Sequence, residues 1–217
     1  MKRVLLSWSS GKDSAWTLYR LQQDPTVELV GLLTTFNESA DRVAMHAVRR
    51  EIVNAQAAAA GLPLFPVSIP SPCTNEIYES RMREAMAHAK SAGVTHAAFG
   101  DLFLEDIRRY REERLAPTGI EPMFPLWGIP TGALAKEMVR GGLRATITCV
   151  DPKQLDRSFA GGRFEECVFP EGVDPCGERG EFHTCVTAGP MFGSPIPTTT
   201  GGVVERDGFV VCDVTLR

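Results

Sequence analysis

The stretch from Val4 to Leu21, V-L-L-S-W-S-S-G-K-D-S-A-W-T-L-Y-R-L, decides the fold that we expect for this chain. Its first residues, Val4 to Trp8, form a short apolar run that predicts a buried strand, and apolar residues then follow at helical spacing until Pro25. The small and polar residues Ser9 to Ser14 lie between strand and helix. Because such a turn points backbone N–H groups and the positive end of a helix dipole at one spot, it predicts a phosphate site.

The spacing within this turn excludes one class of phosphate loop. A Walker A loop needs a glycine five residues before the glycine that precedes its lysine, and Ser or Thr after that lysine. No glycine stands there before Gly11, and Asp13 follows Lys12. The six residues resemble S-G-G-x-D-S, the pyrophosphate loop of the ATP pyrophosphatases, which split ATP between its α and β phosphates. Ser10 replaces the first glycine, and we expect a cost of about 1 kcal/mol if its φ is positive. A polar turn that binds nothing is the alternative.

Length and charge restrict the class of protein. With 217 residues, 43% of them hydrophobic, the chain can bury one core, or a main domain with a small companion. Lys and Arg number 23 against 27 for Asp and Glu, so we expect no unspecific binding to nucleic acid. No apolar run is long enough to span a bilayer and no cleavable signal precedes the loop, so we expect a cytoplasmic protein without a membrane partner.

The six cysteines form no C-x-x-C pair. This argues against a zinc knuckle and against a thioredoxin-type redox site, and we expect the thiols to be reduced and mostly buried. Sulfur transfer to tRNA, which some pyrophosphate-loop enzymes carry out with paired cysteines, is therefore the less favoured chemistry.

Strands and helices are predicted to alternate along the chain. The predicted strands are 27–34, 64–69, 95–100 and 144–150, and the predicted helices are 41–60, 76–91, 104–115 and 131–140. This rhythm predicts the α/β class, a Rossmann-like open parallel sheet flanked by helices, followed by a smaller C-terminal α+β domain. The two prolines of F-P-L-W-G-I-P at 124–130 mark a hinge, so we expect domains at 1–128 and 129–217.

The C-terminal part carries fewer signals. We expect a short helix from Asp151 and a hairpin at 202–216 that turns at Asp207-Gly208. The pattern does not tell which sheet receives the strand 144–150. The segment after Pro195 is a candidate subunit contact in a homo-oligomer.

Polar residues stand at the ends of two predicted strands, 4–8 and 95–100. The carboxyl ends of parallel strands form the sheet edge where ligands of such folds lie. Asp101, after Gly100, suits magnesium or a ribose hydroxyl, with a helix cap as the alternative. His46 either approaches a nucleotide or is a surface histidine. Arg108 and Arg111 share one face of the charged helix, which either is solvated or offers an arginine to a phosphate or carboxylate.

A second polar constellation, G-V-D-P-C-G-E-R-G-E-F-H-T-C-V-T-A-G-P, occupies 172–190. Its glycines predict a loop that can gather acids and a histidine in a pocket. Three interpretations stay open: metal ligation, acids that cap turns, and substrate handling in which carboxylates hold a cation or an amine while His183 moves a proton.

The motifs W-S-S-G-K-D-S-A, M-H-A-V-R, F-G-D, P-L-W, D-P-C-G-E-R-G-E-F-H-T-C-V and G-P-M-F together resemble the diphthine–ammonia ligase family of ATP-binding proteins, over about Lys2 to Phe192. The resemblance implies an adenine nucleotide α-hydrolase-like (HUP-type) domain and a smaller acceptor domain. It also implies that ATP adenylates a carboxylate, giving pyrophosphate, and that ammonia then displaces AMP to form an amide. The acceptor carboxylate belongs to a modified protein, as with diphthine, or to a small molecule.

The same resemblance implies roles for individual residues. Those implied to bind ATP are Ser9, Ser10, Gly11, Lys12, Asp13, Ser14, Thr34, His46, Gly100 and Asp101. Those implied to bind the acceptor are Arg108, Arg111, Trp127, Asp174, Glu178, Glu181, Phe182, His183 and Thr184. The implied catalytic residues are Lys12, Asp13, Glu178, Glu181 and His183, and Asp13 is the candidate Mg²⁺ ligand.

Two expectations follow from these roles. The loop 9–14 and the segment 178–184 should line opposite walls of one cleft. Trp127, Phe182 and the two glutamates should receive the trimethylammonium group if the acceptor is diphthine. A non-catalytic ATP-binding or sensing protein, and a tRNA-modifying enzyme with a pyrophosphate loop, are the alternatives.

Overall fold

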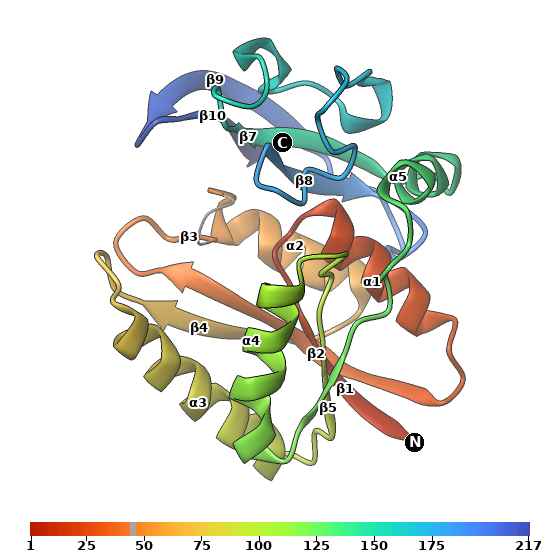
Figure 1. Cartoon of the computed structure of the whole chain (residues 1–217), viewed down its shortest axis with the longest axis vertical. Helices are drawn as coiled ribbons and strands as arrows, with labels where there is room; N and C mark the ends of the chain where they lie inside the picture. Colours follow the sequence, from red (N-terminus) through yellow and green to blue (C-terminus); the bar gives the residue numbers. More distant parts are fainter. Residues whose placement is uncertain (44–46) are drawn as a thin grey trace.

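The N-terminal part of the chain is built on a sheet whose strands are mostly parallel (Figure 1). The computed structural model describes residues 1–43 and 47–217. The strands of this sheet are β1 (Lys2–Ser7), β2 (Val27–Asn37), β3 (Arg42–Val43), β4 (Leu64–Ile69), β5 (His96–Ala98) and β6 (Glu121–Met123). β1 pairs in parallel with both β2 and β5, which makes it a central strand. Its residues Val4 and Leu6 are fully buried, as the apolar run predicted.

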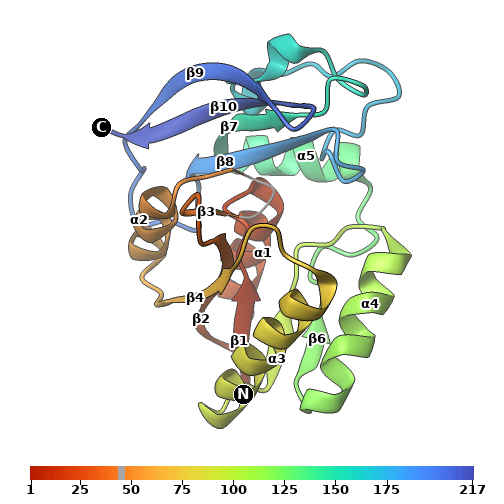
Figure 2. The same cartoon turned by 90° about the vertical axis from the view of Figure 1, so that its left-hand side faces the viewer.

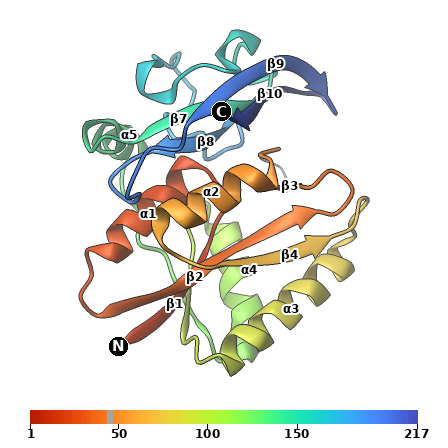
Figure 3. The same cartoon turned by 180° about the vertical axis from the view of Figure 1, so that it is seen from behind.

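Helices cover both faces of this sheet. α1 (Lys12–Gln22) and α2 (Arg50–Ala60) lie on the face toward the second sheet, whereas α3 (Asn75–Ser91) and α4 (Glu105–Leu115) lie on the opposite face (Figures 1 and 3). Helices on both faces of a mostly parallel sheet define a doubly wound α/β fold. The predicted Rossmann-like fold is confirmed. In the described part of the chain, no helix is long and apolar enough to cross a membrane.

A smaller antiparallel sheet follows α5 (Thr131–Arg140). It has the strand order β8-β7-β10-β9. These strands are β7 (Arg144–Val150), β8 (Phe182–Ala188), β9 (Thr198–Arg206) and β10 (Phe209–Leu216). The predicted strand 144–150 therefore belongs to the second sheet. The predicted hairpin is confirmed, and φ is positive at both Asp207 and Gly208 in its turn. The boundary at 128/129 falls between β6 and α5 and stays a prediction.

The helix predicted over 41–60 is wrong in its first part, because α2 begins only at Arg50. Asp41 and Ala47 have φ values of +50° and +57°, which a right-handed helix cannot contain. Val43 instead pairs with Phe36 of β2. The helix was predicted from a stripe of residues at helical spacing, Met45, Val48, Ile52, Ala55 and Ala59, but strand pairing determines where it starts.

Two further differences concern the second half of the chain. The helix expected from Asp151 is a turn, followed by a short 3-10 helix at Arg157–Phe159. Strand β8 was not predicted, because the glycines before it made the whole segment look like a loop. The alternation F-H-T-C-V-T-A was its signal, with Phe182, Thr184 and Val186 among its buried positions.

One core joins the two sheets. α1 and α2 lie between them, with α1 in contact with β8 and α2 in contact with β10. Trp8, Trp16, Leu134, Ile147 and Phe182 belong to a single cluster of buried residues that includes side chains from both sheets. Since this core is continuous, the loop after β1 and the segment before β8 are held in a fixed relation to each other.

Candidate active site

A cavity of about 440 Å³ lies where the loop after β1 meets the segment that leads into β8. Ser9 and the loop from Gly11 to Ser14 line one side of it. Glu178, His183 and Thr184 line it from the second sheet, and Gly100 and Asp101 contribute the end of β5. The expected cleft between the two segments is therefore present. Its volume lies within the range of pockets that hold small molecules.

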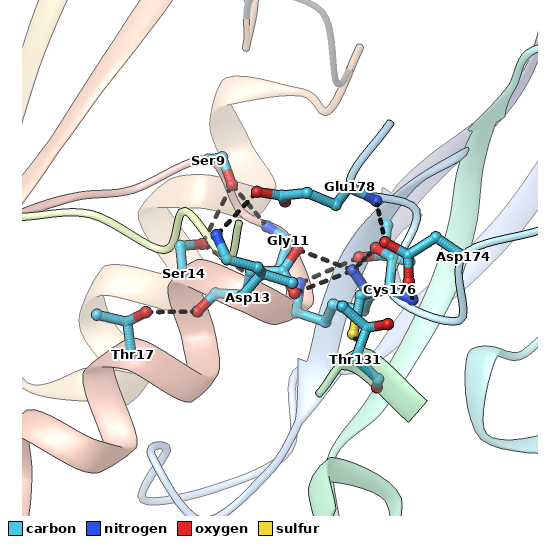
Figure 4. Close-up of polar contacts among 12 residues, drawn as sticks. Ser9, Gly11, Asp13, Ser14, Thr17, Thr131, Asp174, Cys176 and Glu178 are labelled. Atoms are coloured by element: carbon cyan, nitrogen blue, oxygen red, sulfur yellow. Dashed lines mark hydrogen bonds and ion pairs between the residues drawn. The ribbon is translucent and has the colours of Figure 1, made fainter. Parts of the chain in front are cut away.

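The loop places the start of α1 at this cavity (Figure 4). Gly11 is the N-cap and has no side chain of its own to cap the helix, while Thr184 Oγ1 accepts a hydrogen bond from Lys12 N in the first turn. The Ser9 and Ser14 hydroxyls are 3.2 Å apart, and Ser14 Oγ donates to the Gly11 carbonyl at 2.9 Å. A helix N-terminus with hydroxyl groups beside it suits an anion.

The end of β5 packs directly on this loop. A Cβ atom at Gly100 would lie 2.9 Å from the carbonyl carbon of Asp13 and 3.0 Å from the backbone nitrogen of Ser14. Both atoms belong to the backbone and cannot turn away as a side chain can. Position 100 therefore requires glycine, and the close approach fixes the first turn of α1.

Ser10 takes the strained conformation that the glycine of the motif would accommodate. Its φ is +72°. Its carbonyl accepts hydrogen bonds from Val186 N at 2.9 Å and from Gln56 Nε2 at 3.1 Å, which hold the loop to β8 and α2. The Ser10 hydroxyl is buried and has no hydrogen-bond partner among the described residues. Ser10 supports the loop from behind and is not part of the cavity lining.

Lys12 and Asp13 form a buried ion pair at the centre of the site. Lys12 Nζ lies 2.8 Å from Asp13 Oδ2, and it also donates to the Cys176 carbonyl. Burial is the largest single influence and lowers the pKa of Lys12, but Asp13, Cys176 and Glu178 together outweigh it, so the pKa lies above its ordinary value. Burial likewise raises the pKa of Asp13, and Lys12 opposes that effect. We take Lys12 as protonated, because its ammonium group has carboxylate and carbonyl acceptors around it.

Two acids of the second constellation bind backbone amides. Asp174 accepts hydrogen bonds from Cys176 N at 3.0 Å and Glu178 N at 3.3 Å (Figure 4). Glu181, which is 2% exposed, accepts from Asp174 N and Arg179 N, both at 3.0 Å. These carboxylates fold the loop, as the interpretation of acids that cap turns expects.

Glu178 and His183, in contrast, face the cavity. Glu178 Oε1 accepts a hydrogen bond from Leu102 N at 2.8 Å. Burial raises the pKa of Glu178 to about 7, although the bond from Leu102 opposes the shift. Burial and then the charge of Lys12 lower the pKa of His183 to about 4, so the imidazole is neutral at pH 7. The site thus holds one carboxyl group that exchanges protons near neutral pH.

Contacts across the cavity connect its two walls. The backbone nitrogen of Lys12 donates to Thr184 Oγ1 at 3.0 Å, and the Lys12 ammonium lies 5.4 Å from the centroid of the Phe182 ring. At the β5 side, Arg111 Nε donates to Asp101 Oδ2 at 2.9 Å. Asp101 therefore has a cationic partner, and this pair forms the edge of the site toward α4.

The structure gathers most of the expected residues at the cavity. The lining includes Ser9, Gly11, Lys12, Asp13, Ser14, Gly100, Asp101, Arg111, Glu178, Phe182, His183 and Thr184. The expected residues outside the lining are Ser10, Thr34, Arg108, Trp127, Asp174 and Glu181. His46 lies outside the described residues.

Two of the outlying residues have other contacts. Thr34 is buried and donates to the carbonyl of Trp8 at 2.8 Å. Trp127 lies beneath the Arg108 guanidinium, 4.8 Å from the ring centroid. Trp127 and Phe182 do not line the same cavity. The aromatic binding site expected for a trimethylammonium group is therefore not formed in this structure.

Several lining residues were not predicted. They are Ser7, Phe99, Asp151, Gln154, Cys176, Gly177, Arg179, Gly180 and Phe209. Asp151 and Gln154 follow directly after β7, so the polar run D-P-K-Q at a strand end was an available signal. The loop also depends on Gln56, which bonds the carbonyls of Ser10 and Val186. A glutamine among the alanines of α2 was the signal for that role.

The donor set bears on metal binding. In residues 1–43 and 47–217, no group of three or more His, Cys, Asp or Glu side chains could hold a metal ion. Both carboxylate oxygens of Asp13 lie within 3.0 Å of Lys12 Nζ. A cation here would therefore need most of its ligands from a bound phosphate chain, which is how Mg²⁺ is usually held beside nucleotides.

The fold and the site define a class of protein. The chain is a doubly wound α/β protein whose first strand–helix turn has Gly11 as its N-cap and lines a cavity together with the loop before β8. Residues 1–120 match the diphthamide synthase N-terminal domain, and the chain belongs to this family. It is also similar to a diphthine–ammonia ligase from Danio rerio, with 27% identity over 214 residues that cover 88% of this chain and 84% of that protein. The family resemblance of the motifs is thereby confirmed.

Proposed function

We propose that the protein is an ATP-dependent ligase that forms an amide from an acceptor carboxylate and ammonia, with AMP and pyrophosphate as the other products. One observation carries the proposal: the loop Ser9 to Ser14 and the segment Glu178 to Thr184 line a single cavity of about 440 Å³. The membership in the diphthamide synthase family and the similarity to a diphthine–ammonia ligase support it.

The loop side of the cavity suits the phosphates of ATP. The α1 N-terminus, the hydroxyls of Ser9 and Ser14, and the Lys12 ammonium offer hydrogen bonds and positive charge to phosphoryl oxygens. The departing pyrophosphate carries much of the charge that develops in the transition state, so fixed positive groups at this place would lower the barrier.

The proposed reaction has two steps. A carboxylate oxygen attacks the α-phosphorus of ATP, the bond between the α-phosphorus and the bridging oxygen breaks, and pyrophosphate leaves with that electron pair. Ammonia then attacks the carbonyl carbon of the acyl adenylate, the bond to the AMP oxygen breaks, and the nitrogen loses a proton. A carboxylate alone is a poor electrophile, so the enzyme mainly aligns the reactants and neutralises charge.

Glu178 suits the role of the base in the second step. It lines the cavity, and Leu102 N holds one of its carboxylate oxygens. Because its pKa is about 7, it is partly deprotonated at neutral pH and can accept the proton that the attacking nitrogen releases. Asp174 and Glu181 act as positioning residues for this loop through their bonds to backbone amides.

Mg²⁺ would accompany ATP in this scheme. Asp13 is the carboxylate of the loop that could contact it, and the phosphate oxygens would supply further ligands. The ion would neutralise phosphate charge and thereby assist the departure of pyrophosphate. A single carboxylate such as that of Asp13 suits a cation whose other ligands come from the nucleotide phosphates.

The alternative chemistries receive less support. Burial raises the pKa of Cys149 to about 11 and that of Cys185 to about 12, so neither thiol is activated for sulfur transfer. A protein that only senses ATP has no use for a cavity-facing carboxyl group with a pKa near 7. We place the protein in the cytoplasm, as the sequence predicts, and leave the oligomeric state to measurement.

The proposal is tested by incubating the full chain with ATP, Mg²⁺, ammonium chloride and a panel of carboxylic acids. We expect AMP and pyrophosphate to form only with an accepted acid, and ¹⁸O from the carboxylate to appear in AMP. ADP as the product, or AMP without the label, would contradict the proposed adenylation.

A pair of variants controls this test. Asp13→Asn keeps the shape of the side chain but removes the charge that pairs with Lys12, and we expect AMP formation to fall by at least about 100-fold. Asp106→Asn makes the same exchange at an exposed position of α4 and should leave the rate unchanged. Equal rates for both variants would remove Asp13 from the mechanism.

A further inference from the structure

A second cavity lies on the other face of the N-terminal sheet, between α3 and α4. It has a volume of about 640 Å³. Its apolar side chains include Leu5 and Leu33 of the sheet, Phe99 directly after β5, Met82 and Met86 of α3, and Leu115 of α4. Figure 2 shows the two helices on this face, at a distance from the second sheet. We call this cavity the α3/α4 groove, and none of the functions discussed above uses it.

The groove adjoins the candidate active site. Ser7, Phe99 and Arg111 line both cavities, so the groove and the candidate active site lie side by side at these residues. Phe99 and Arg111 also touch each other, with the guanidinium carbon 4.5 Å from the ring centroid. At its other end the groove reaches Lys90, Ser91 and Thr118. The groove therefore extends along α3 from Tyr78 to Ser91, a length of about 20 Å.

The polar side chains of the groove favour an anion. Four cationic side chains line it, Arg83, Lys90, Arg111 and Arg114, against two carboxylates, Glu79 and Glu113. Glu79 is already paired with Arg114 at 2.6 Å, which links α3 to α4. The cation nearest the active site is Arg111, which lines both cavities and is itself paired with Asp101 at 2.9 Å. An apolar body with a negative end therefore complements this surface better than one with a positive end.

We propose that the α3/α4 groove holds the apolar body of the acceptor acid, an elongated carboxylic acid whose carboxylate passes Phe99 and Arg111 into the nucleotide cavity. This inference rests on the proposed function and specifies its substrate class. The apolar walls supply binding energy remote from the reaction, and Arg111 orients the carboxylate toward the loop. An acceptor with a fixed trimethylammonium group would meet an excess of positive charge in the groove.

Decanoate is the probe for this proposal, measured by calorimetric titration of the full chain without ATP. Decyltrimethylammonium has the same chain with the opposite charge, and acetate has the carboxylate without the chain. We expect decanoate to bind at least 10-fold more tightly than either. Equal affinity for the two long-chain probes, or no binding of decanoate, would overturn the assignment.

Two tryptophan variants on α3 locate the binding. Ala87 is exposed and lines the groove, so Ala87→Trp fills it without disturbing the core. His88 is exposed and is not part of the groove lining, so His88→Trp adds the same side chain elsewhere on the helix. We expect at least a 10-fold loss of decanoate affinity with Ala87→Trp and none with His88→Trp, at unchanged melting temperatures. Equal losses in both variants would contradict the proposal.

Two other occupants of the groove would give different results. If the groove held the nucleoside of ATP, Ala87→Trp would weaken AMP binding as well, and AMP would compete with decanoate. If a second copy of the chain covered it, Ala87→Trp would change the sedimentation of the protein. Either outcome would overturn the proposal.

The proposed function can fail independently of this inference. If an accepted acid yields labelled AMP but decanoate does not bind the groove, the ligase stands and the groove assignment is wrong. If decanoate binds with the expected sensitivity to Ala87→Trp but no acid yields AMP, the groove binds acids and the ligase proposal is wrong.

Discussion

At the scale of single residues, the candidate site depends on how two carboxyl groups of one loop differ. Glu181 is almost fully buried and binds two backbone amides, whereas Glu178 receives one and faces the cavity. Both stand in the motif G-E-R-G-E at a spacing of three residues, so only their surroundings distinguish a structural acid from one that exchanges protons.

Glu178 gives a testable dependence of the rate on pH. Since the pKa of Glu178 is about 7 and the base must be deprotonated, the rate of amide formation at a fixed concentration of free ammonia should rise through pH 7 and level off above it. Glu178→Gln should lower the rate by about 100-fold and remove the rise. Glu171→Gln, at an exposed position, is the matched control. A rise through pH 7 that persists in Glu178→Gln would assign the titration to another group.

The same shift has a consequence for stability. The folded protein holds a proton on Glu178 up to about pH 7, while the unfolded chain releases it near the ordinary pKa of a glutamate side chain, 4.5. The free energy of unfolding therefore contains a contribution that is lost as the pH rises from about 4.5 to 7. Glu178→Gln cannot release a proton, so its unfolding free energy should fall less over that range in urea titrations.

Ser10 is a second residue whose effect can be measured. It holds φ at +72° and buries an unpartnered hydroxyl. Ser10→Gly should relieve both costs. Glycine also raises the conformational entropy of the unfolded chain, which offsets part of the gain, so the net stabilisation should be about 1 kcal/mol. Ser10→Ala removes only the hydroxyl and separates the two contributions. Because Ser10 is not part of the cavity lining, the ATP affinity of Ser10→Gly should stay within about twofold of wild type. A lower stability of Ser10→Gly would show that the positive φ of Ser10 does not strain the loop.

At the scale of elements, the site depends on the contact between the end of β5 and the start of α1. Gly100 leaves no room for a side chain against the backbone of Asp13 and Ser14. The strand therefore sets the position of the first helical turn, whose N–H groups we expect to bind phosphate. The position of the proposed phosphate-binding groups therefore depends on the residue at the end of β5.

Gly100→Ala tests this contact. The added methyl group must push the loop away from β5, so the affinity for ATP should drop by at least about 10-fold, since a shift of the loop misaligns several hydrogen bonds at once. Gly132→Ala is the control, because a Cβ there meets nothing within 4 Å. Titration calorimetry with ATP gives both affinities, and an unchanged affinity in Gly100→Ala would show that the loop does not need this packing.

Elements also show where prediction from sequence fails. Periodicity predicted α1, α3, α4 and α5 because each carries its own pattern of apolar and polar residues. It misplaced the start of α2, where Asp41 and Ala47 take positive φ and Val43 pairs with β2. It missed β8, whose pattern is short and follows a loop of glycines. Both errors arise where a partner strand determines the local conformation.

At the scale of the whole molecule, one cluster of charges joins the two sheets. Asp213 of β10 lies 2.8 Å from an Arg42 nitrogen and 2.6 Å from one of Arg49, both of which precede α2. These bonds hold the pKa of Asp213 well below its usual range, the hydrogen bond from Arg49 being the main cause. Since the cavity lies between the sheets, this cluster contributes to keeping its walls together.

Asp213→Asn should lower the free energy of unfolding by about 1 kcal/mol at pH 7, a modest figure because the carboxylate is partly exposed. The pKa of Asp213 is lower in the folded state than the ordinary value of 3.8, so its contribution is present above about pH 4 and is lost as the pH falls below it. The difference between wild type and Asp213→Asn should therefore shrink in urea titrations below pH 4. Glu205→Gln, at an exposed position of β9, should show neither effect.

The sequence was enough to predict the strand–loop–helix unit at residues 4–21, the alternation of strands and helices, and the family, because each of these depends on residues close to one another along the chain. It also determined which residue types would meet at the site, through two motifs about 165 positions apart.

Which of those residues face the cavity became known only from the packing of the folded chain. Glu178 and His183 line it, Asp174 and Glu181 fold the loop behind it, and Ser10 supports the loop out of reach of the cavity. The same holds for the α3/α4 groove, whose lining includes residues of β1, β2, β5, α3, α4 and the 3-10 helix Ala116–Thr118. Burial and hydrogen bonding depend on partners brought together from distant parts of the chain, and local patterns do not encode those partners.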